Sequence, residues 1–300
     1  MDNSAVRNIL ENILTEDLIF ENEPMGKHTT FRTGGKAAFY VTPENEEQIV
    51  ALANELKGIP HMFMGNGSNL LFTDGGYEGV VIEIGSKFSK ITVEDNCIIA
   101  ESGALLSKVA NVALEHGLGG MEFAAGIPGS IGGAVAMNAG AYGGEMKDIV
   151  TLSTCVGESG IVLEIEDHEF SYRHSIFSDK PLVVLKTVLK LQPKNKDEIK
   201  AEMVELNKRR KDKQPLEYPS AGSTFKRPEG YFAGKLVEDA GLKGCRIGGA
   251  MVSEKHAGFV INYDNATATD ILNLMDHIKS EVYMQFGVEL EPEVKIIGKE

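Results

Sequence analysis

The amino-acid sequence predicts an α+β fold with a larger N-terminal region followed by a smaller α+β region. Short apolar runs of strand length alternate with helical patterns, and two pairs of strands are joined by tight turns. The segment QPLEYP, with two prolines in six residues, separates two stretches that each contain both kinds of element. We therefore place the regions at 1–213 and 214–300, and we divide the first into subdomains at about 1–85 and 86–213.

Each predicted element has a reason in the sequence. In the first helix, apolar residues recur with helical spacing, Thr42 can cap the start, Pro43 suits the first turn and Gly58 ends the pattern. In chain order we predict helix 42–58, strands 61–65 and 79–84, a hairpin turning at Asp95-Asn96, helix 105–116, strands 149–156, 161–165 and 181–191, and a helix ending in KRRKDK at 208–213. For the second region we predict helix 233–240, strands 247–252 and 258–262, helix 269–286 and a last strand in EVKIIG.

Composition excludes several classes of protein. The chain has 30 basic and 44 acidic residues, a net charge of −14 and a pI near 5.0, so it lacks the broad basic face that nucleic acid requires. No apolar run approaches the length of a membrane span, and acidic residues stand where a signal peptide needs positive charge. The three cysteines are far apart and the seven histidines show no metal-binding spacing, so we expect no metal site and a reducing, cytoplasmic location.

Two glycine-rich segments need an explanation. GNGSNLL follows a predicted strand, but Leu70 breaks the G-x-G-x-x-G fingerprint, and no P-loop is present. Its backbone N–H groups can point at an anion, or the segment can be a plain tight turn. Residues 117–144 hold ten of the 33 glycines, which suits either close approach to a large flat group or packing of backbone on backbone. Within that segment, Pro128-Gly129-Ser130 offers N–H groups at a predicted helix start.

Three further residues have the chemistry of catalysis, and each also has an ordinary structural interpretation. Arg173 in SYRHSIF can stack on a surface tyrosine, Ser223 in AGSTFKRP can be a turn or cap residue, and Glu293 can be a solvated acid at a strand start. The run KRRKDK is typical of a helix C-terminus, where cations interact favourably with the helix dipole. Taken singly, these residues do not decide between structure and function.

Taken together, eight strings resemble the UDP-N-acetylenolpyruvoylglucosamine reductase family. They occur in order from about residue 27 to the C-terminus, and the long glycine-rich string together with AGSxFK makes the resemblance specific. The strings are HTTFRTGG at His28, GNGSNLL at Gly65, GxPGSIGGAVxMNAGAYGGE from Gly126, SYRxSxF at Ser171, AGSxFKRP at Ala221, AGKLxxxAGLKG at Ala233, KHAGFVIN at Lys255 and EPEVKIIG at Glu291.

The resemblance implies a FAD-binding domain of the vanillyl-alcohol-oxidase (PCMH) type followed by a smaller α+β substrate-binding domain. It implies non-covalent FAD, NADPH as hydride donor and a UDP-sugar substrate, and this type of fold holds FAD without the Rossmann fingerprint. Glycines in two loops would let the backbone approach the cofactor closely. The implied cofactor-binding residues are Gly65, Asn66, Gly67, Ser68, Asn69, Gly126, Ile127, Pro128, Gly129, Ser130, Gly132, Gly133, Asn138 and Gly140.

The family reaction reduces an enolpyruvyl ether of UDP-N-acetylglucosamine to UDP-N-acetylmuramate, in peptidoglycan precursor synthesis. By resemblance, Arg173 stabilises the enolate that forms, Ser223 donates a proton, and Glu293 holds the geometry or shares a proton. Cations near the substrate diphosphate would give part of the basic run a function. The implied substrate-binding residues are Lys213, Lys226 and Arg227.

The chain departs from the family pattern in two places. Lys295 stands where relatives often have an arginine, so we assign it no role, and short connections resemble the form of the family that lacks a tyrosine-bearing substrate loop. Two alternatives remain: an oxidase on the same flavin fold, which would use oxygen, and a non-catalytic nucleotide-sugar binder. The C-terminal strings count against the first and the intact candidate residues against the second. We expect a monomer.

Overall fold

The computed structural model describes residues 2–299, which divide into two compact units. The first unit contains residues 2–21, 39–66 and 79–210, and the second contains 22–38, 67–78 and 211–299. The units therefore differ from a contiguous division at residue 213, because two N-terminal stretches pack with the C-terminal one. The assignment of functional domains to 1–213 and 214–300 stays a prediction.

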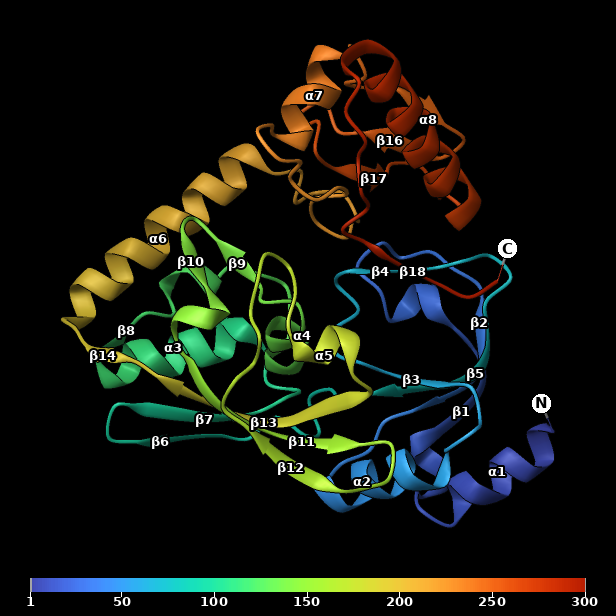
Figure 1. The fold of residues 1–300 in the computed structure, drawn as a ribbon, viewed down its shortest axis with the longest axis vertical. Coiled ribbons are helices and arrows are strands. Elements are labelled where there is room, and N and C mark those ends of the chain that lie inside the picture. The colour runs from blue at the N-terminus through green and yellow to red at the C-terminus, as the bar shows by residue number, and fades with distance from the viewer. Residues whose placement is uncertain (1, 300) are drawn as a thin grey trace. The chain divides into compact units, whose positions relative to one another are not determined.

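Helices are interspersed with runs of consecutive strands along the chain (Figure 1). The α-helices are α1 (Asn3–Glu11), α2 (Glu46–Glu55), α3 (Leu106–His116), α4 (Ile131–Ala136), α5 (Ile176–Asp179), α6 (Lys196–Lys213), α7 (Ala233–Asp239) and α8 (Ala268–Phe286). Short 3-10 helices lie at Glu16–Leu18, Met25–Lys27, Glu122–Ala124 and Met146–Asp148. The strands are β1 (Ile19–Pro24), β2 (Lys36–Val41), β3 (His61–Met64), β4 (Leu70–Phe72), β5 (Tyr77–Glu83), β6 (Ile91–Glu94), β7 (Cys97–Glu101), β8 (Leu118–Gly119), β9 (Gly140–Ala141), β10 (Gly144–Glu145), β11 (Val150–Gly157), β12 (Val162–Ile165), β13 (Leu182–Lys190), β14 (Gln192–Pro193), β15 (Arg246–Ile247), β16 (Ala250–Val252), β17 (Val260–Asn262) and β18 (Lys295–Ile297).

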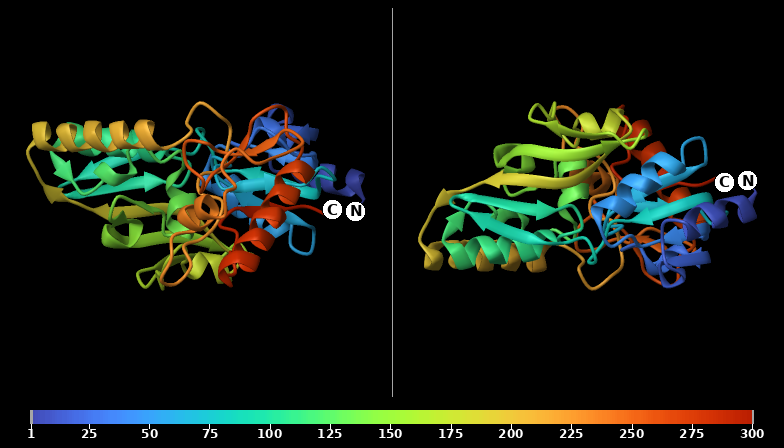
Figure 2. Two further views of the ribbon diagram at one scale, coloured as in Figure 1. Left: turned by 90° about the horizontal axis from the view of Figure 1, so that it is seen from above. Right: turned by 90° about the horizontal axis from the view of Figure 1, so that it is seen from below.

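An antiparallel five-stranded sheet of order β12-β11-β13-β7-β6 supports the first unit. Its two predicted hairpins are confirmed: β6 and β7 pair with Glu94 opposite Cys97, and β11 and β12 pair with Val156 opposite Val162. Asp95 adopts φ 52° in the first turn, a conformation that Asp and Asn tolerate better than most residues. The two strands of the β6–β7 hairpin lie side by side in both views of Figure 2.

Two helices beside this sheet carry the glycine-rich segment and its surroundings. Helix α3 ends as predicted at Gly117, which adopts a left-handed φ of 68°. Buried side chains of α3, α4 and the sheet form one apolar core. Its fully buried members include Ile98, Leu106, Val109, Ile131 and Leu189. The start of α4 is therefore fixed by packing against a rigid sheet.

Helix α2 is shorter at both ends than the sequence predicts, because it begins later and ends earlier. The side chain of Asn45 accepts a hydrogen bond from the Gln48 N–H at 2.9 Å and caps the helix, so the predicted start at Thr42 is wrong. The helix ends at Glu55, and Gly58, with φ 80°, lies beyond it. The wrong start has a simple cause: Asn45, like the expected cap Thr42, is a polar residue that can cap a helix.

The second unit joins a small sheet, β15-β16-β17, to the predicted long helix α8. A capping box between Thr267 and Asp270 starts α8. The predicted single strand at 247–252 is wrong: the chain turns at Gly248, which has φ 55°, and two antiparallel strands result. Strand β18, predicted in EVKIIG, pairs in parallel with β4, with Lys295 opposite Leu70.

The three cysteines are free thiols. In the part of the chain that the structure describes, no helix is long and apolar enough to cross a bilayer. Between residues 2 and 299, no three His, Cys, Asp or Glu side chains gather as metal ligands would.

A buried carboxylate in the first unit makes folding sensitive to one lysine. Burial by itself would raise the pKa of the Glu122 carboxyl, but the Lys194 ammonium at 2.9 Å and the Gly120 N–H at 2.6 Å hold that pKa below its usual value. We expect Lys194→Met to lower the free energy of unfolding by about 2 kcal/mol, because it leaves the carboxylate buried without its cation. Lys190→Met, on an exposed side chain, is the matched control.

The pH dependence follows from the lowered pKa of Glu122. A carboxyl whose pKa is depressed in the folded state contributes stability above its unfolded pKa, and that contribution is lost as the pH falls through the folded value. Wild type should therefore lose more stability than Lys194→Met between about pH 5 and pH 3 in urea unfolding. Equal losses in the two proteins would show that this ion pair contributes nothing.

Candidate functional site

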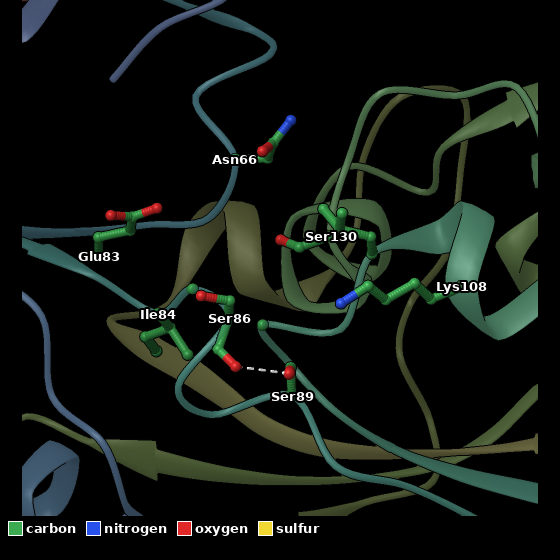
Figure 3. Close-up of a pocket in the computed structure, with 10 residues that line it drawn as sticks. Asn66, Glu83, Ile84, Ser86, Ser89, Lys108 and Ser130 are labelled. Atoms are coloured by element: carbon green, nitrogen blue, oxygen red, sulfur yellow. Dashed lines mark hydrogen bonds between the residues drawn. The ribbon is translucent and has the colours of Figure 1, made fainter. Parts of the chain in front are cut away.

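A pocket of about 190 Å³ opens in the first unit where several strands end (Figure 3). One side is formed by residues that lie within three positions of the ends of β3, β5 and β7, and another by Ser130, the N-cap of α4. The lining residues are Asn66, Glu83, Ile84, Gly85, Ser86, Ser89, Gly103, Leu105, Lys108 and Ser130. Two of them, Asn66 and Ser130, are among the cofactor-binding residues predicted from sequence.

The Ser130 hydroxyl is the clearest sign of a ligand. Ser130 is only 3% exposed, and its Oγ has no hydrogen-bond partner among the residues that the structure describes. Figure 3 shows this hydroxyl pointing toward the middle of the pocket. Gly65 lies against it, since a Cβ at Gly65 would collide with the Ser130 Oγ. Because a buried hydroxyl without a partner is costly, the site fits a ligand that supplies one.

The pocket also has a glycine-lined wall and a cation. A Cβ at Gly103 would collide with the carbonyl oxygens of Gly85 and Phe88, so only glycine fits there. The Lys108 amino group points toward the middle of the pocket in Figure 3. Sequence reasoning missed these residues, although Gly85-Ser86 after β5 and Ser102-Gly103 after β7 are small residues at strand ends. This combination suits an anionic group.

The two predicted cofactor loops meet at the pocket, but one predicted feature is wrong. The Asn66 side-chain amide donates to the Pro128 carbonyl at 2.9 Å, which joins the loops. The N–H of Gly129 does not face a ligand, because it donates to the Ile127 carbonyl at 2.9 Å. Gly67, Ser68 and Asn69 belong to the second unit.

Other glycines of the segment have structural reasons of their own. The Gly132 N–H donates to the Ser102 carbonyl at 2.8 Å, and a Cβ at Gly132 would lie 2.7 Å from the Ser102 Cβ. At Gly126 a Cβ would lie 2.6 Å from the Asn207 Oδ1. By contrast, a Cβ at Gly133 would find only the Ser130 Oγ, at 3.8 Å, so that glycine borders open space.

The Asn138 side chain is not available to a ligand. It has no exposed surface, and its carboxamide hydrogen bonds are made within the protein, to Glu145, Ser171 and Lys147. A contact of Asn138 with the cofactor would therefore have to come from its backbone, and its role in FAD binding stays a prediction. Gly140 likewise packs in the β9–β10 hairpin, where a Cβ would lie 2.7 Å from the Glu145 Cγ.

Arg173 lies in a loop that hydrogen bonds attach to the glycine-rich segment. Its Nη2 donates to the Gly140 carbonyl at 3.1 Å. Its Cζ lies 5.3 Å from the centre of the Tyr172 ring, so the ordinary interpretation as a tyrosine stack also applies. Arg173 adopts φ 55°, a strained conformation for an arginine that must be held by its surroundings.

His168 fixes the start of this loop. Its Nδ1 donates to the Glu166 carbonyl at 2.9 Å, and its Nε2 accepts from the Ser153 hydroxyl at 2.8 Å. Burial lowers the pKa of His168, so the ring is neutral in this arrangement. The Ile176 N–H donates to the His168 carbonyl at 2.9 Å and closes the loop.

In the second unit, Ser223 and Glu293 lie on neighbouring backbone segments. The Glu293 N–H donates to the carbonyl of Thr224, the residue after Ser223, at 2.9 Å. Asn69 supports the same segment, because its amide donates to the Glu293 carbonyl at 3.0 Å and its own carbonyl accepts from the Lys295 N–H at 3.0 Å. Ser223 is exposed and Glu293 is half-buried. The side chain of Asn69 thus holds the backbone of Glu293 in position.

The three cations predicted to bind substrate differ in their surroundings. Lys226 forms an ion pair with Glu291 at 2.5 Å, so part of its charge is already neutralised. The Arg227 guanidinium lies 4.0 Å from the centre of the Phe232 ring. Lys213 is exposed at the end of α6. Of the three cations predicted to bind substrate, one is thus paired with a carboxylate, one lies against an aromatic ring and one is exposed.

Comparison with known families defines the class of protein. Residues 37–166 match the FAD binding domain family, which agrees with a PCMH-type flavin fold that needs no Rossmann fingerprint. Residues 214–297 match the C-terminal domain of UDP-N-acetylenolpyruvoylglucosamine reductase. The chain is a flavoprotein oxidoreductase by class, and it belongs to the UDP-N-acetylenolpyruvoylglucosamine reductase family.

Individual relatives support this membership along the whole chain. The UDP-N-acetylenolpyruvoylglucosamine reductase of Caldanaerobacter subterraneus is 52% identical over 294 residues, covering 97% of both chains. That of Clostridioides difficile is 51% identical over 304 residues, covering 100% of both. The crystal structure of the reductase (MurB) from Thermus caldophilus matches with a TM-score of 0.81 and 34% identity, covering 93% of this chain and 98% of the other.

Proposed function

We propose that the chain catalyses the NADPH-dependent reduction of UDP-N-acetyl-3-O-(1-carboxyvinyl)glucosamine to UDP-N-acetylmuramate, with non-covalent FAD as cofactor. The observation that carries the proposal is the 51% identity to a reductase of this family over the full length of both chains. The product is a peptidoglycan precursor, so we expect the enzyme to act in the cytoplasm. We also expect the enzyme to be a monomer.

The pocket residues fit the charged part of FAD. The unpartnered Ser130 hydroxyl and the Lys108 ammonium can donate to phosphate oxygens. Glycines at 85 and 103 keep the backbone accessible. With about 190 Å³, the pocket has room for only part of a dinucleotide, because complete small-molecule sites usually enclose about 300–1,000 Å³.

The candidate catalytic residues then have defined tasks. FAD held at the Ser130 and Lys108 pocket would supply hydride transfer from NADPH to the terminal methylene carbon of the enolpyruvyl group. Negative charge develops beside the substrate carboxylate, and the planar Arg173 guanidinium stabilises it with paired donors. The Ser223 hydroxyl gives its proton to the carbon that carries this charge, and Glu293 orients these groups or shares the proton. A serine hydroxyl can do this because an enolate is a strong base.

The visible spectrum of the purified protein tests the proposal. The protein should be yellow, and acid precipitation should release all flavin into the supernatant. Anaerobic NADPH should bleach the flavin, and the enolpyruvyl sugar should restore its colour. Reoxidation by oxygen but not by the sugar would favour an oxidase. A colourless protein that cannot be reconstituted with FAD would refute the proposal.

Gly65→Ala tests the pocket itself. The added Cβ would collide with the Ser130 Oγ, so the hydroxyl must leave its position, and we expect FAD affinity to fall by about 100-fold, or roughly 2.7 kcal/mol. Gly157→Ala is the matched control, since its Cβ finds only an ordinary contact at 3.6 Å. FAD titration of the deflavinated proteins, followed by flavin fluorescence, gives the dissociation constants. Unchanged affinity in Gly65→Ala would place the cofactor elsewhere.

A further inference from the structure

The loop that carries Arg173 is tied to the glycine-rich segment at several points. Besides the bond from Arg173 to the Gly140 carbonyl, the Ser175 hydroxyl donates to the Ala136 carbonyl at 2.7 Å. The Ser178 hydroxyl donates to the same carbonyl at 3.0 Å. The segment from 136 to 140 therefore forms the support on which this loop rests.

Asn138 lies in the middle of that support and makes the central connection. Its Nδ2 donates to the Ser171 carbonyl at 2.9 Å and to the Glu145 Oε2 at 3.0 Å, and its Oδ1 accepts from the Lys147 N–H at 3.0 Å. The side chain has no exposed surface, so water cannot replace these bonds. Ser171 lies two residues before Arg173. The Asn138 carboxamide thus connects the segment 136–140, the end of β10 and the loop that carries Arg173.

The surrounding charges show that Arg173 lies near this connection. The ammonium of Lys147, at 2.7 Å, and the Asn138 amide lower the pKa of the Glu145 carboxyl, and the charge of Arg173 lowers it further. Asn138 itself adopts φ 44°, which Asn tolerates better than other side chains except Asp. A residue held in this conformation with every amide hydrogen used is a rigid support.

We propose that Asn138 is a positioning residue for the reaction: by holding the Ser171 carbonyl, it fixes the loop that aims the Arg173 guanidinium. The role rests on the proposed function of Arg173. It predicts an effect on substrate reduction and little effect on cofactor binding, although Asn138 lies within the segment that the resemblance assigns to FAD. Asn138 acts only through Arg173.

Two substitutions remove the amide donor in different ways. Asn138→Gly keeps the left-handed backbone without strain, and Asn138→Asp keeps the size of the side chain. Asn265→Gly is the matched control, because Asn265 is an exposed asparagine with φ 49°. In each holoenzyme we expect an FAD dissociation constant within about threefold of wild type and normal bleaching by NADPH. Reoxidation by the enolpyruvyl sugar should be about 10- to 100-fold slower in both Asn138 variants, with kcat falling more than KM rises.

A double-mutant cycle with Arg173→Ala separates positioning from a general loss of structure. If Asn138 acts through Arg173, Asn138→Gly should slow reoxidation by less than about threefold in the Arg173→Ala background. Hydrogen exchange in the deflavinated protein gives a readout independent of activity. Amides of residues 168–176 should exchange faster in Asn138→Gly than in wild type or Asn265→Gly. If Asn138→Gly proves too unstable to purify, Asn138→Asp carries the same comparisons.

The outcomes are distinguishable. Full additivity in the cycle, unchanged exchange of the loop, or a large loss of FAD affinity in both Asn138 variants would overturn the positioning role. A wild-type holoenzyme whose flavin the sugar cannot reoxidise would refute the proposed function, and the positioning role with it. Normal reoxidation in wild type and in both Asn138 variants would refute the positioning role alone.

Discussion

Ser223→Ala should still bleach its flavin when NADPH is added anaerobically, while reoxidation by the enolpyruvyl sugar becomes slower by about 10²- to 10⁴-fold. The reason is that a positioned general acid contributes about this much, and only the second half-reaction needs a proton at carbon. Ser223→Cys should retain more activity, because a thiol can donate the proton. Stopped-flow absorbance of the flavin measures both half-reactions separately.

Ser220→Ala provides the control for Ser223, since it removes a neighbouring hydroxyl with no proposed role. If Ser223 is only a turn or cap residue, alanine should instead cost about 1 kcal/mol of stability and affect both half-reactions alike. Rapid reoxidation in Ser223→Ala would exclude the acid role and point to a water molecule or a lysine as the donor.

Arg173→Ala and Arg173→Lys should both slow substrate reduction, by about 10²- to 10³-fold for the alanine variant. Removal of one donor to a developing oxyanion is typically worth this much. Lysine should not restore the rate, because an ammonium cannot present paired planar donors or keep the geometry of the bond to the Gly140 carbonyl. Single-turnover reoxidation of the reduced holoenzyme is the measurement.

Arg209→Ala is the appropriate control for Arg173, because Arg209 is exposed and forms an ion pair with Glu205 on the same helix. Its turnover should match wild type, since exposed pairs of this kind contribute little. Near-normal reoxidation in both Arg173 variants would exclude the catalytic role and leave Arg173 with its structural contacts, the Tyr172 ring and the Gly140 carbonyl.

Local sequence signals predicted most elements of the fold. The turn at Asp95-Asn96 and the end of α3 at Gly117 depend on one or two residues whose backbone preferences are strong, and both are confirmed. The start of α2 was misplaced because Thr42 and Asn45 can both cap a helix, and only the packing of the first turn decides between them. The turn at Gly248 was missed for a similar reason, since glycine in a short apolar run fits both a strand and a bend.

The candidate site was harder to predict because its parts come from separate strand ends. Gly65 and Ser130 belong to recognisable strings, but Gly103 is conspicuous only once the carbonyls of Gly85 and Phe88 are seen against it. Asn138 lies in a cofactor-like string, but the buried hydrogen bonds of its side chain show a supporting role that the string does not reveal. Spacing along the chain does not reveal which way a side chain points.

The pairing of β4 with β18 also bears on how the chain is made in the cell. Leu70 cannot form this parallel pair until Lys295, 225 residues later in the chain, has been synthesised. At about 5–20 residues per second, synthesis leaves β4 without its partner for about 10–45 s. The nascent chain therefore holds an unpaired strand edge, beside an incomplete second unit, while the first unit can already fold. Residues 22–38 and 67–78 both pack with the C-terminal stretch, so we expect chaperones to bind these two stretches during translation.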